Sequence, residues 1–516
     1  MTTRKDRVLW ADDEIELLKP HILFLQDKGY EVVPVVSGQD ALDCCREQVF
    51  DIIFLDENMP GLTGLETLVK IKEINPNVPV VMVTKSEEES IMNQAIGNKI
   101  ADYLIKPVNP NQLFLSIKKN VHKNVIISET TTVNYQQEFG RIGMQIGDTR
   151  TANEWMELYK KIVYWELELE GNQVPMADML TMQKQEANNA FGKFVKKNYI
   201  NWIKNPEERP LMSPDLFKKK VFPMLDNEEK VFFILIDNFR LDQWWVVKDL
   251  LANYFSFDED LYYSILPTAT QYARNSIFSG LMPLQIEKMF PELWVDEESE
   301  EGKNLNESPL IQTQIDRFRK KYTFSYHKVI ESSYGEKLLA NISSLSHNDL
   351  NVIVLNFVDM LSHARTEMKM IRELAQSEAA YRSLTRSWFQ HSTTLELFRR
   401  IAEKGYKVVL TTDHGTIRVT EPLKVIGDKN TNTNLRYKVG KNLSYNPKDV
   451  FEIRNPEDIG LPTPNLTSKY IFALNESFLA YPNNYNYYVS YYKNTFQHGG
   501  ISMEEMMVPF IVMNPK

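Results

Sequence analysis

Short apolar runs that end directly in acidic residues recur in two separate parts of the sequence. RVLWADD and DIIFLDEN lie near the start, and KVFFILID, NVIVLNFVD and YKVVLTTDH lie in the second half of the chain or just before it. Such runs are typical of parallel strands that are buried on both faces. In open parallel sheets, the carboxyl ends of the strands carry the functional site. The pattern therefore predicts two α/β sheets, each with carboxylates at one edge.

The first of these sheets is predicted within residues 5–120, where five apolar runs alternate with segments of helical periodicity. The expected helices cover residues 14–28, 38–48, 64–74, 88–97 and 109–119. Five strands alternating with five helices indicate a doubly wound parallel sheet.

Polar residues follow four of the five predicted strands. Asp12 and Asp13 follow the first strand, Asp56 the third, Thr84 the fourth and Lys106 the fifth. Three converging carboxylates repel one another, so the arrangement requires a cation, and a site made only of oxygen ligands suits Mg²⁺. Lys106 would balance the charge of an incoming phosphoryl group.

This set of residues resembles the receiver domain of two-component response regulators, a flavodoxin-like fold. The resemblance implies that a sensor histidine kinase phosphorylates Asp56, and that Asp12 and Asp13 bind Mg²⁺ with the backbone carbonyl of Asn58. It also implies that the threonine and lysine after the fourth and fifth strands contact the acyl phosphate.

Two further residues match the receiver pattern. Lys106–Pro107 fits the cis peptide of the family, and Tyr103 fits its aromatic switch position. We therefore predict that phosphorylation favours a homodimer through the face that contains Tyr103 and the last receiver helix.

The middle of the chain, residues 121–225, has helical periodicity and no alternation typical of strands. Apolar and aromatic residues recur at spacings of three and four over 153–170 and 176–203, and more weakly over 133–146. We expect a bundle of three helices whose aromatic stripe forms a core rather than a cofactor site. No helix-turn-helix signature is present, which disfavours a transcription factor. The predicted domains are residues 1–122, 123–225 and 226–516.

Five fragments of the last region hold the residue types of a metal site. The fragment ILPTATQYARNSIFSG is accompanied by LIDNFRLDQ, NFVDMLSHART, TTDHG and FQHGG. The candidate ligands in these fragments are Asp237, Thr270, Asp359, His363, Asp413, His414 and His498. Hydroxyl, carboxylate and imidazole ligands together suit Zn²⁺ better than Mg²⁺, and seven ligands are enough for two ions.

The reach of the side chains divides these ligands into two sets. The first set is Asp237, Thr270, Asp413 and His414, and the second is Asp359, His363 and His498. Asp413 and His414 leave one sharp turn, and Asp359 and His363 share a face if a helical turn follows their strand. Two ions about 4 Å apart stabilise both oxygens of a displacement at phosphorus. They would also lower the pKa of the Thr270 hydroxyl, which is otherwise a weak nucleophile.

The ordered pattern D…PTxT(x)9G…DxxxH…DHG…HGG resembles the alkaline phosphatase superfamily. PTATQYARNSIFSG and HGGISMEEMMVP are similar to its PglZ-type branch, and the resemblance covers roughly residues 228–516. It implies that Thr270 is the catalytic nucleophile and that the seven residues are zinc ligands.

The sequence departs from the superfamily beside the nucleophile. Nucleotide pyrophosphatase-like members carry an asparagine three residues after it, which binds the transferring phosphoryl oxygen, whereas this chain has Ala273. Arg274 or Asn275 could take over phosphate binding. Thr268 is a rival nucleophile, and is otherwise a turn or capping residue if Thr270 attacks.

Composition limits the partners and the location of the protein. A formal net charge of −10 argues against a protein that coats nucleic acid, although a small anionic substrate remains compatible. The adjacent Cys44 and Cys45 cannot form a structural disulfide on a helix. The chain begins without a signal-peptide pattern and contains no run of about 18 apolar residues, so we expect a cytoplasmic protein without membrane insertion. Five tyrosines within 485–492 favour a strand before His498.

The order of receiver, helical linker and PglZ-type domain resembles response regulators tied to type IX secretion in Bacteroidetes. That resemblance implies a zinc-dependent phosphodiesterase acting on cyclic or linear oligonucleotides, with a sigma factor or a secretion component as a further partner. The alternative is a zinc-stabilised adaptor whose vestigial site signals by binding a partner. Retention of Thr270 beside all the ligands favours the enzyme. A phosphomonoesterase or phosphomutase remains a third option.

Overall fold

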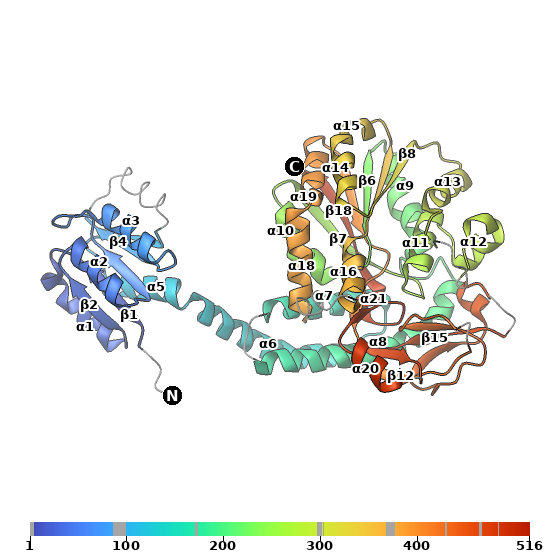
Figure 1. The fold of residues 1–516 in the computed structure, drawn as a ribbon, viewed down its shortest axis with the longest axis horizontal. Helices are drawn as coiled ribbons and strands as arrows, with labels where there is room; N and C mark the ends of the chain where they lie inside the picture. Colours follow the sequence, from blue (N-terminus) through green and yellow to red (C-terminus); the bar gives the residue numbers. More distant parts are fainter. Residues whose placement is uncertain are drawn as a thin grey trace. The chain divides into compact units, whose positions relative to one another are not determined.

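The computed structural model describes most of the chain. The described residues are 5–85, 100–170, 174–296, 302, 304–367, 377–428, 431–463, 467–482 and 484–516. They form two compact units, Met1–Asn134 and Tyr135–Lys516, which we call the first and the second unit (Figure 1). The predicted helix over 88–97 lies outside the described residues.

A parallel sheet of five strands forms the centre of the first unit. Its strands are β1 (Arg7–Ala11), β2 (Glu31–Val35), β3 (Ile52–Leu55), β4 (Val80–Thr84) and β5 (Asp102–Ile105), in the order β2-β1-β3-β4-β5. All neighbouring pairs are parallel. This is the flavodoxin-like strand order, so the predicted fold class is confirmed.

Alternate residues of these strands face two separate hydrophobic cores. The helices are α1 (Lys19–Asp27), α2 (Gly38–Glu47), α3 (Gly64–Ile74) and α5 (Pro110–Val121). Trp10 and Phe54 point into one core, which α1 and α5 cover, while Leu9 and Leu55 point into the other, which α2 and α3 cover. This two-residue alternation leaves only the strand ends free to carry polar groups.

The middle region forms three helices, as predicted. They are α6 (Lys123–Asp148), α7 (Ala152–Glu168) and α8 (Val174–Lys204). Their apolar faces do not form an isolated bundle, because they share one core with the rest of the second unit. The Trp202 ring lies 5.3 Å from that of Tyr263, and the Tyr263 hydroxyl donates to the Ala152 carbonyl at 2.9 Å. The domain boundaries at 122 and 225 stay predictions.

A mixed sheet of six strands organises the second unit. The strands are β6 (Val231–Ile236), β7 (Phe255–Tyr263), β8 (Phe324–Val329), β9 (Leu350–Leu355), β10 (Lys407–Thr411) and β18 (Met507–Pro515), in the order β7-β18-β10-β6-β9-β8. Strands β10, β6, β9 and β8 run parallel, and β18 is antiparallel to both of its neighbours. Because β10, β6 and β9 are adjacent and parallel, the residues that follow them meet at one edge.

Helices flank this sheet, and three small sheets complete the unit. The helices are α9 (Phe222–Asp226), α10 (Leu241–Leu251), α11 (Thr270–Ser279), α12 (Pro283–Met289), α13 (Glu307–Arg317), α14 (Ser332–Ala340), α15 (Ile342–Leu345), α16 (Phe357–Glu367), α18 (Glu378–His391), α19 (Thr393–Glu403), α20 (Tyr485–Tyr492) and α21 (Met503–Met506). Figure 1 shows α10, α18 and α19 on one side of the sheet, and α11, α12 and α13 on the other.

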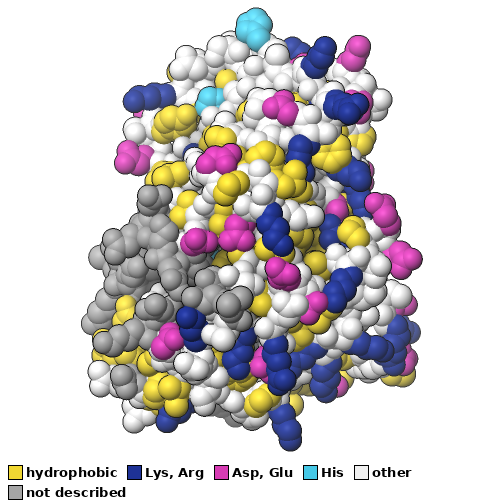
Figure 2. Space-filling model, turned by 90° about the vertical axis from the view of Figure 1, so that its right-hand side faces the viewer, with side chains coloured by type: hydrophobic (Ala, Val, Ile, Leu, Met, Phe, Trp, Pro, Cys, Tyr) yellow, Lys and Arg dark blue, Asp and Glu magenta, His cyan; other side chains and the backbone are white. Residues whose placement is uncertain are grey.

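The small strands are β11 (Ile417–Arg418), β12 (Glu421–Lys424), β13 (Tyr437–Gly440), β14 (Val450–Ile453), β15 (Lys469–Ala473), β16 (Ser477–Ala480) and β17 (Phe496–Gln497). They pair as β11-β17, β12-β16 and β13-β15-β14. Figure 2 shows Lys and Arg side chains concentrated in the lower part of the face that it presents, with acidic side chains scattered over it. Within the described residues, no helix has both the length and the apolar character needed to cross a membrane.

The expected strand of tyrosines is wrong, because Tyr485–Tyr492 forms the helix α20. Tyr485, Val489 and Tyr492 recur at helical spacing and pack on a buried apolar cluster. Tyr487 and Tyr491, four residues apart, stack with ring centroids 6.1 Å apart. Packing of one helical face has therefore outweighed the strand preference of the aromatic residues.

Candidate functional site

The carboxylates of the first unit converge as the sequence predicts. Oxygens of Asp12, Asp13 and Asp56 lie within 4.8 Å of one another, which suits a cation such as Mg²⁺. The Lys106 ammonium lies 2.6 Å from Asp12 Oδ2 and 2.9 Å from Asp56 Oδ2. Burial raises the pKa of Asp12, and hydrogen bonds to the two carboxylates raise the pKa of Lys106 in spite of its own burial. Thr84 is fully buried at the end of β4.

The remaining receiver residues lie around this cluster. Lys106–Pro107 is cis, as predicted. Asn58 is exposed two residues after Asp56, and Tyr103 is half-buried on β5. The roles of Asn58 in Mg²⁺ binding and of Tyr103 as a switch stay predictions.

The first ligand set of the second unit lies where β6, β10 and α11 meet. Asp237 follows β6, Asp413 and His414 follow β10, and Thr270 begins α11. Asp237, Asp413 and His414 each offer one ligand atom, and these three atoms lie within 4.8 Å of one another. The Thr270 hydroxyl oxygen is 3.1 Å from His414 Nε2 and 3.5 Å from Asp237 Oδ1. All four predicted members are thus together.

The second ligand set lies beside the first. Asp359 and His363 sit in α16, one helical turn apart, and His498 follows β17. Asp359 Oδ1 is 3.6 Å from His363 Nε2 and 3.8 Å from His498 Nε2. The rings of His414 and His498 stack with centroids 4.3 Å apart, so the two sets are neighbours.

Backbone carbonyls orient His414, which is buried, and His498, which is partly buried, toward the ligand sets. His414 Nδ1 lies 3.1 Å from the Gly415 carbonyl, and His498 Nδ1 lies 3.2 Å from the Thr268 carbonyl. A proton on each Nδ1 leaves Nε2 with its lone pair toward the other ligands, which is the form that binds a metal. Burial, together with the neighbouring His414 and His363, lowers the pKa of His498 well below its ordinary value. These donors fit Zn²⁺.

Thr268, the rival nucleophile, forms hydrogen bonds within the turn that carries His498. Its hydroxyl donates to the Gly500 carbonyl at 2.9 Å and accepts the Gly499 N–H at 3.0 Å. Both hydrogen-bonding capacities of the hydroxyl are therefore used within the turn. This geometry favours Thr270 as the nucleophile.

Asn238 joins the two ligand sets, and the sequence reasoning missed it. Its N–H donates to Asp413 Oδ1 at 3.3 Å, and its Nδ2 donates to Asp359 Oδ1 at 3.4 Å. Its backbone is left-handed, with φ of 62°, which asparagine tolerates better than most residues. Within the described residues, its buried Oδ1 makes no hydrogen bond. An asparagine directly after a strand-end ligand was the only sequence signal.

The two candidate phosphate-binding residues are both buried in α11. Asn275 is 2% exposed, and Arg274 is fully buried against the carboxylates of Asp237 and Asp413. Burial, with Asp413 and Asp359 nearby, raises the pKa of Asp237 well above its ordinary value. Arg274 and His414 outweigh burial at Asp413 and lower its pKa.

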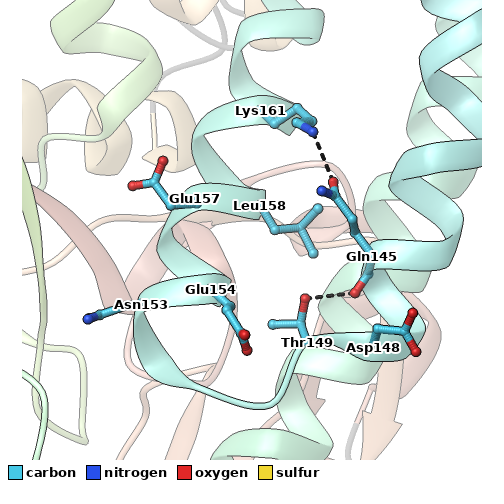
Figure 3. Close-up of a pocket in the computed structure, with 8 residues that line it drawn as sticks. All are labelled: Gln145, Asp148, Thr149, Asn153, Glu154, Glu157, Leu158 and Lys161. Carbon is cyan, nitrogen blue, oxygen red and sulfur yellow. Dashed lines mark hydrogen bonds between the residues drawn. The ribbon is translucent and has the colours of Figure 1, made fainter.

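A separate cavity of about 560 Å³ lies between α6 and α7. Figure 3 shows Lys161 and Thr149 hydrogen-bonded to Gln145 across it. Glu154, on its wall, belongs to the capping box with Thr151 at the start of α7. Thr149 and Glu154 serve the ends of helices, and Lys161 joins α7 to α6, so the ligand sets form the stronger candidate site.

Three family descriptions match consecutive parts of the chain. Residues 216–513 match the BREX system PglZ alkaline phosphatase-like domain, 125–203 the PorX response regulator linker domain, and 8–118 the response regulator receiver domain. The chain thus joins a response regulator receiver to an alkaline phosphatase-like domain. Since the PglZ match covers more than half of the chain, the chain belongs to the PglZ alkaline phosphatase-like family.

Curated relatives and solved structures match shorter stretches. The transcriptional regulatory protein ZraR of Escherichia coli (strain K12) is 35% identical over 144 residues, which is 28% of this chain and 32% of ZraR. The alginate biosynthesis transcriptional regulatory protein AlgB of Pseudomonas putida is 36% identical over 115 residues, 22% of this chain and 26% of AlgB. The chain therefore spans about a third or less of the length of these relatives. CheY4 of Vibrio cholerae is 29% identical with a TM-score of 0.22, covering 22% of this chain and 98% of CheY4.

Proposed function

We propose that this chain is a response regulator of the PorX type whose second unit is a zinc-dependent phosphodiesterase. In this proposal a PorY-like sensor histidine kinase phosphorylates Asp56, and the enzyme hydrolyses cyclic or linear oligonucleotides in the control of type IX secretion. The observation that carries the enzymatic part is the Thr270 hydroxyl, 3.1 Å from His414 Nε2 at the junction of two ligand sets. An adaptor stabilised by metal would need the ligands but not this hydroxyl.

Each of the two ligand sets would bind one zinc ion. Asp237, Asp413 and His414 would hold one Zn²⁺ together with Thr270. The second Zn²⁺ would be held by Asp359, His363 and His498. Bound zinc supplies positive charge for the oxygens that enter and leave phosphorus.

In this proposal, Thr270 attacks phosphorus from the first turn of α11. Its oxygen forms a bond to phosphorus while the bond to the departing alcohol breaks, and the alcohol leaves with a proton. Water then cleaves the phosphothreonine, which releases a phosphomonoester and restores the hydroxyl. The residue before Thr270, Ala269, provides no side-chain cap. Its carbonyl accepts the N–H groups of Tyr272 and Ala273, so the N–H groups of Thr270 and Gln271 would be the ones that meet the phosphoryl oxygens.

The receiver part of the proposal concerns control and partners. The Asp12, Asp13 and Asp56 cluster would bind Mg²⁺, and Lys106 would pair with the phosphoryl group added to Asp56. Phosphorylation would favour a homodimer. We further propose a cytoplasmic location and contact with a sigma factor or a secretion component.

Thr270→Val tests the enzymatic proposal, because valine keeps the branched shape and removes the hydroxyl. We expect bound zinc to stay near two ions per chain, while hydrolysis of a nucleotide diester falls by about a hundredfold or more. The matched control is Thr385→Val, a buried threonine on α18 that bonds to Gln243 and lies outside both ligand sets. Equal turnover by Thr270→Val and wild type at equal zinc content would refute attack by Thr270. A wild-type chain that binds zinc but cleaves no mono- or diester would favour the adaptor.

A further inference from the structure

Arg274 lies four residues after Thr270 in α11, and its three nitrogens each face a carboxylate. Nε donates to Asp413 Oδ2 at 2.9 Å, and Nη1 donates to Glu307 Oε1 at 3.1 Å. Nη2 forms an ion pair with Asp237 Oδ2. The Arg274 side chain is fully buried. Each guanidinium nitrogen is therefore paired with a protein carboxylate, and the Nη2 contact is an ion pair rather than a hydrogen bond.

The side of Arg274 away from the ligands is also anchored. Glu307, at the start of α13, is 1% exposed and accepts Lys328 Nζ at 3.0 Å through Oε2. The Tyr326 hydroxyl, also from β8, donates to the same oxygen. Glu307 thus holds Arg274 on the side away from the ligands, and two side chains of β8 hold Glu307.

The two aspartates keep oxygens for the ligand side while they pair with Arg274. Asp237 uses Oδ2 for Arg274, and its Oδ1 lies 3.5 Å from Thr270 Oγ1 and 3.9 Å from His414 Nε2. Asp413 Oδ2 contacts Arg274 and is also 3.9 Å from His414 Nε2. A carboxylate oxygen can accept from two partners, so neither aspartate must release Arg274 in order to bind a metal.

Charge balance explains why a cation is needed behind these ligands. Two buried carboxylates held side by side repel each other, and isolated buried charge is costly. An arginine fork pairs with two carboxylates in fixed directions, which a lysine ammonium cannot do. Removal of a group that orients a metal ligand commonly lowers metal affinity by about 10- to 100-fold.

We propose that Arg274 is a positioning residue, which orients Asp237 and Asp413 as metal ligands and does not contact the transferring phosphoryl group. This inference rests on the metal-binding part of the proposed function. It assigns phosphoryl binding to other groups, such as the first turn of α11 or Asn275.

The test compares zinc binding with binding of vanadate, an analogue of the phosphoryl group, in the full chain. Arg274→Lys keeps the charge and loses the fork. We expect one of the two zinc ions to bind at least tenfold more weakly, while the other binds as in wild type. At saturating zinc, vanadate should inhibit or bind the variant as it does the wild type.

Two further variants separate positioning from general damage. Glu307→Gln removes a contact of Arg274 and changes no candidate ligand. We expect it to lower the affinity for the same zinc ion by a smaller factor than Arg274→Lys does. This variant keeps the test valid if Arg274→Lys fails to fold. Arg382→Lys alters another buried arginine, which pairs with Glu166 and Asp242, and should leave both zinc affinities unchanged.

Wild-type zinc affinity in Arg274→Lys and Glu307→Gln would overturn the inference, and so would a wild-type chain that binds no zinc. Unchanged zinc binding with weakened vanadate binding in Arg274→Lys would make Arg274 a phosphoryl contact. A wild-type chain that binds two zinc ions but hydrolyses no phosphodiester would contradict only the proposed activity, because the zinc comparison would still hold.

Discussion

Tyr199→Phe probes how α8 supports Thr270, the proposed nucleophile. The Tyr199 hydroxyl is fully buried and accepts the backbone N–H of Leu266 at 2.7 Å. Leu266 lies four residues before Thr270 and is itself fully buried. Phenylalanine keeps the ring and its packing, so the substitution removes only the acceptor and leaves a buried N–H unpaired.

The magnitude follows from that unpaired group. A buried donor without a partner costs about 1–3 kcal/mol, which lowers the unfolding free energy of the second unit by that amount. The segment before Thr270 also gains freedom, and a small misplacement of a reacting group reduces turnover steeply. We therefore expect kcat to fall about five- to tenfold, with zinc content unchanged.

Denaturant unfolding and diester hydrolysis measure the two effects on the same samples. The control is Tyr164→Phe on α7, because Tyr164 is 47% exposed. That variant should match wild type in both assays. If Tyr199→Phe also unfolds and turns over like wild type, the hydrogen bond does not position the nucleophile and the reasoning fails.

We expect three other outcomes. Beryllofluoride with Mg²⁺ should shift the wild-type chain from monomer toward dimer in light scattering, and Asp56→Ala should abolish the shift; a constant mass for wild type would count against it. Lys106→Met leaves the buried Asp12 and Asp56 carboxylates without their cation, so without Mg²⁺ the receiver should lose about 3 kcal/mol of unfolding free energy. Added Mg²⁺ should stabilise this variant more than it stabilises the wild type. Thermal unfolding measures both effects. Gly415→Ala would place a Cβ 2.0 Å from the Glu504 carbonyl, so the turn after His414 must move and zinc analysis should detect a lost ion.

The ligand sets could be predicted because parallel strands place their ends together. Asp237, Asp359 and Asp413 each follow one of three strands that proved to be neighbours in the sheet. Apolar runs identify such strands from local sequence alone, and the rule about carboxyl ends then supplies the convergence. His498 follows β17, outside the main sheet, so the rule about strand ends does not explain its position.

The role of Arg274 could not be predicted in the same way. Its spacing from Thr270 places both on one face of a helix, which fits a phosphate contact as well as a ligand support. The choice depends on Glu307 and Tyr326, which come from α13 and β8 and have no local sequence relation to Arg274. A long-range ion pair of this kind becomes visible only when the elements are packed.

The position of α8 gives the linker a direct part in the candidate site. Asn188 accepts the Met503 N–H at 2.8 Å and donates to Glu504 at 3.0 Å. The Glu504 carbonyl lies close to Gly415, which directly follows the candidate ligand His414. Tyr199 on the same helix holds the segment before Thr270. The helix α8 therefore contacts both the segment before Thr270 and the segment beside the His414 turn, so a shift of α8 would change their spacing. Because α6 carries residues of both compact units and precedes α7 and α8 in the chain, we expect the helical linker to be where receiver phosphorylation acts on catalysis.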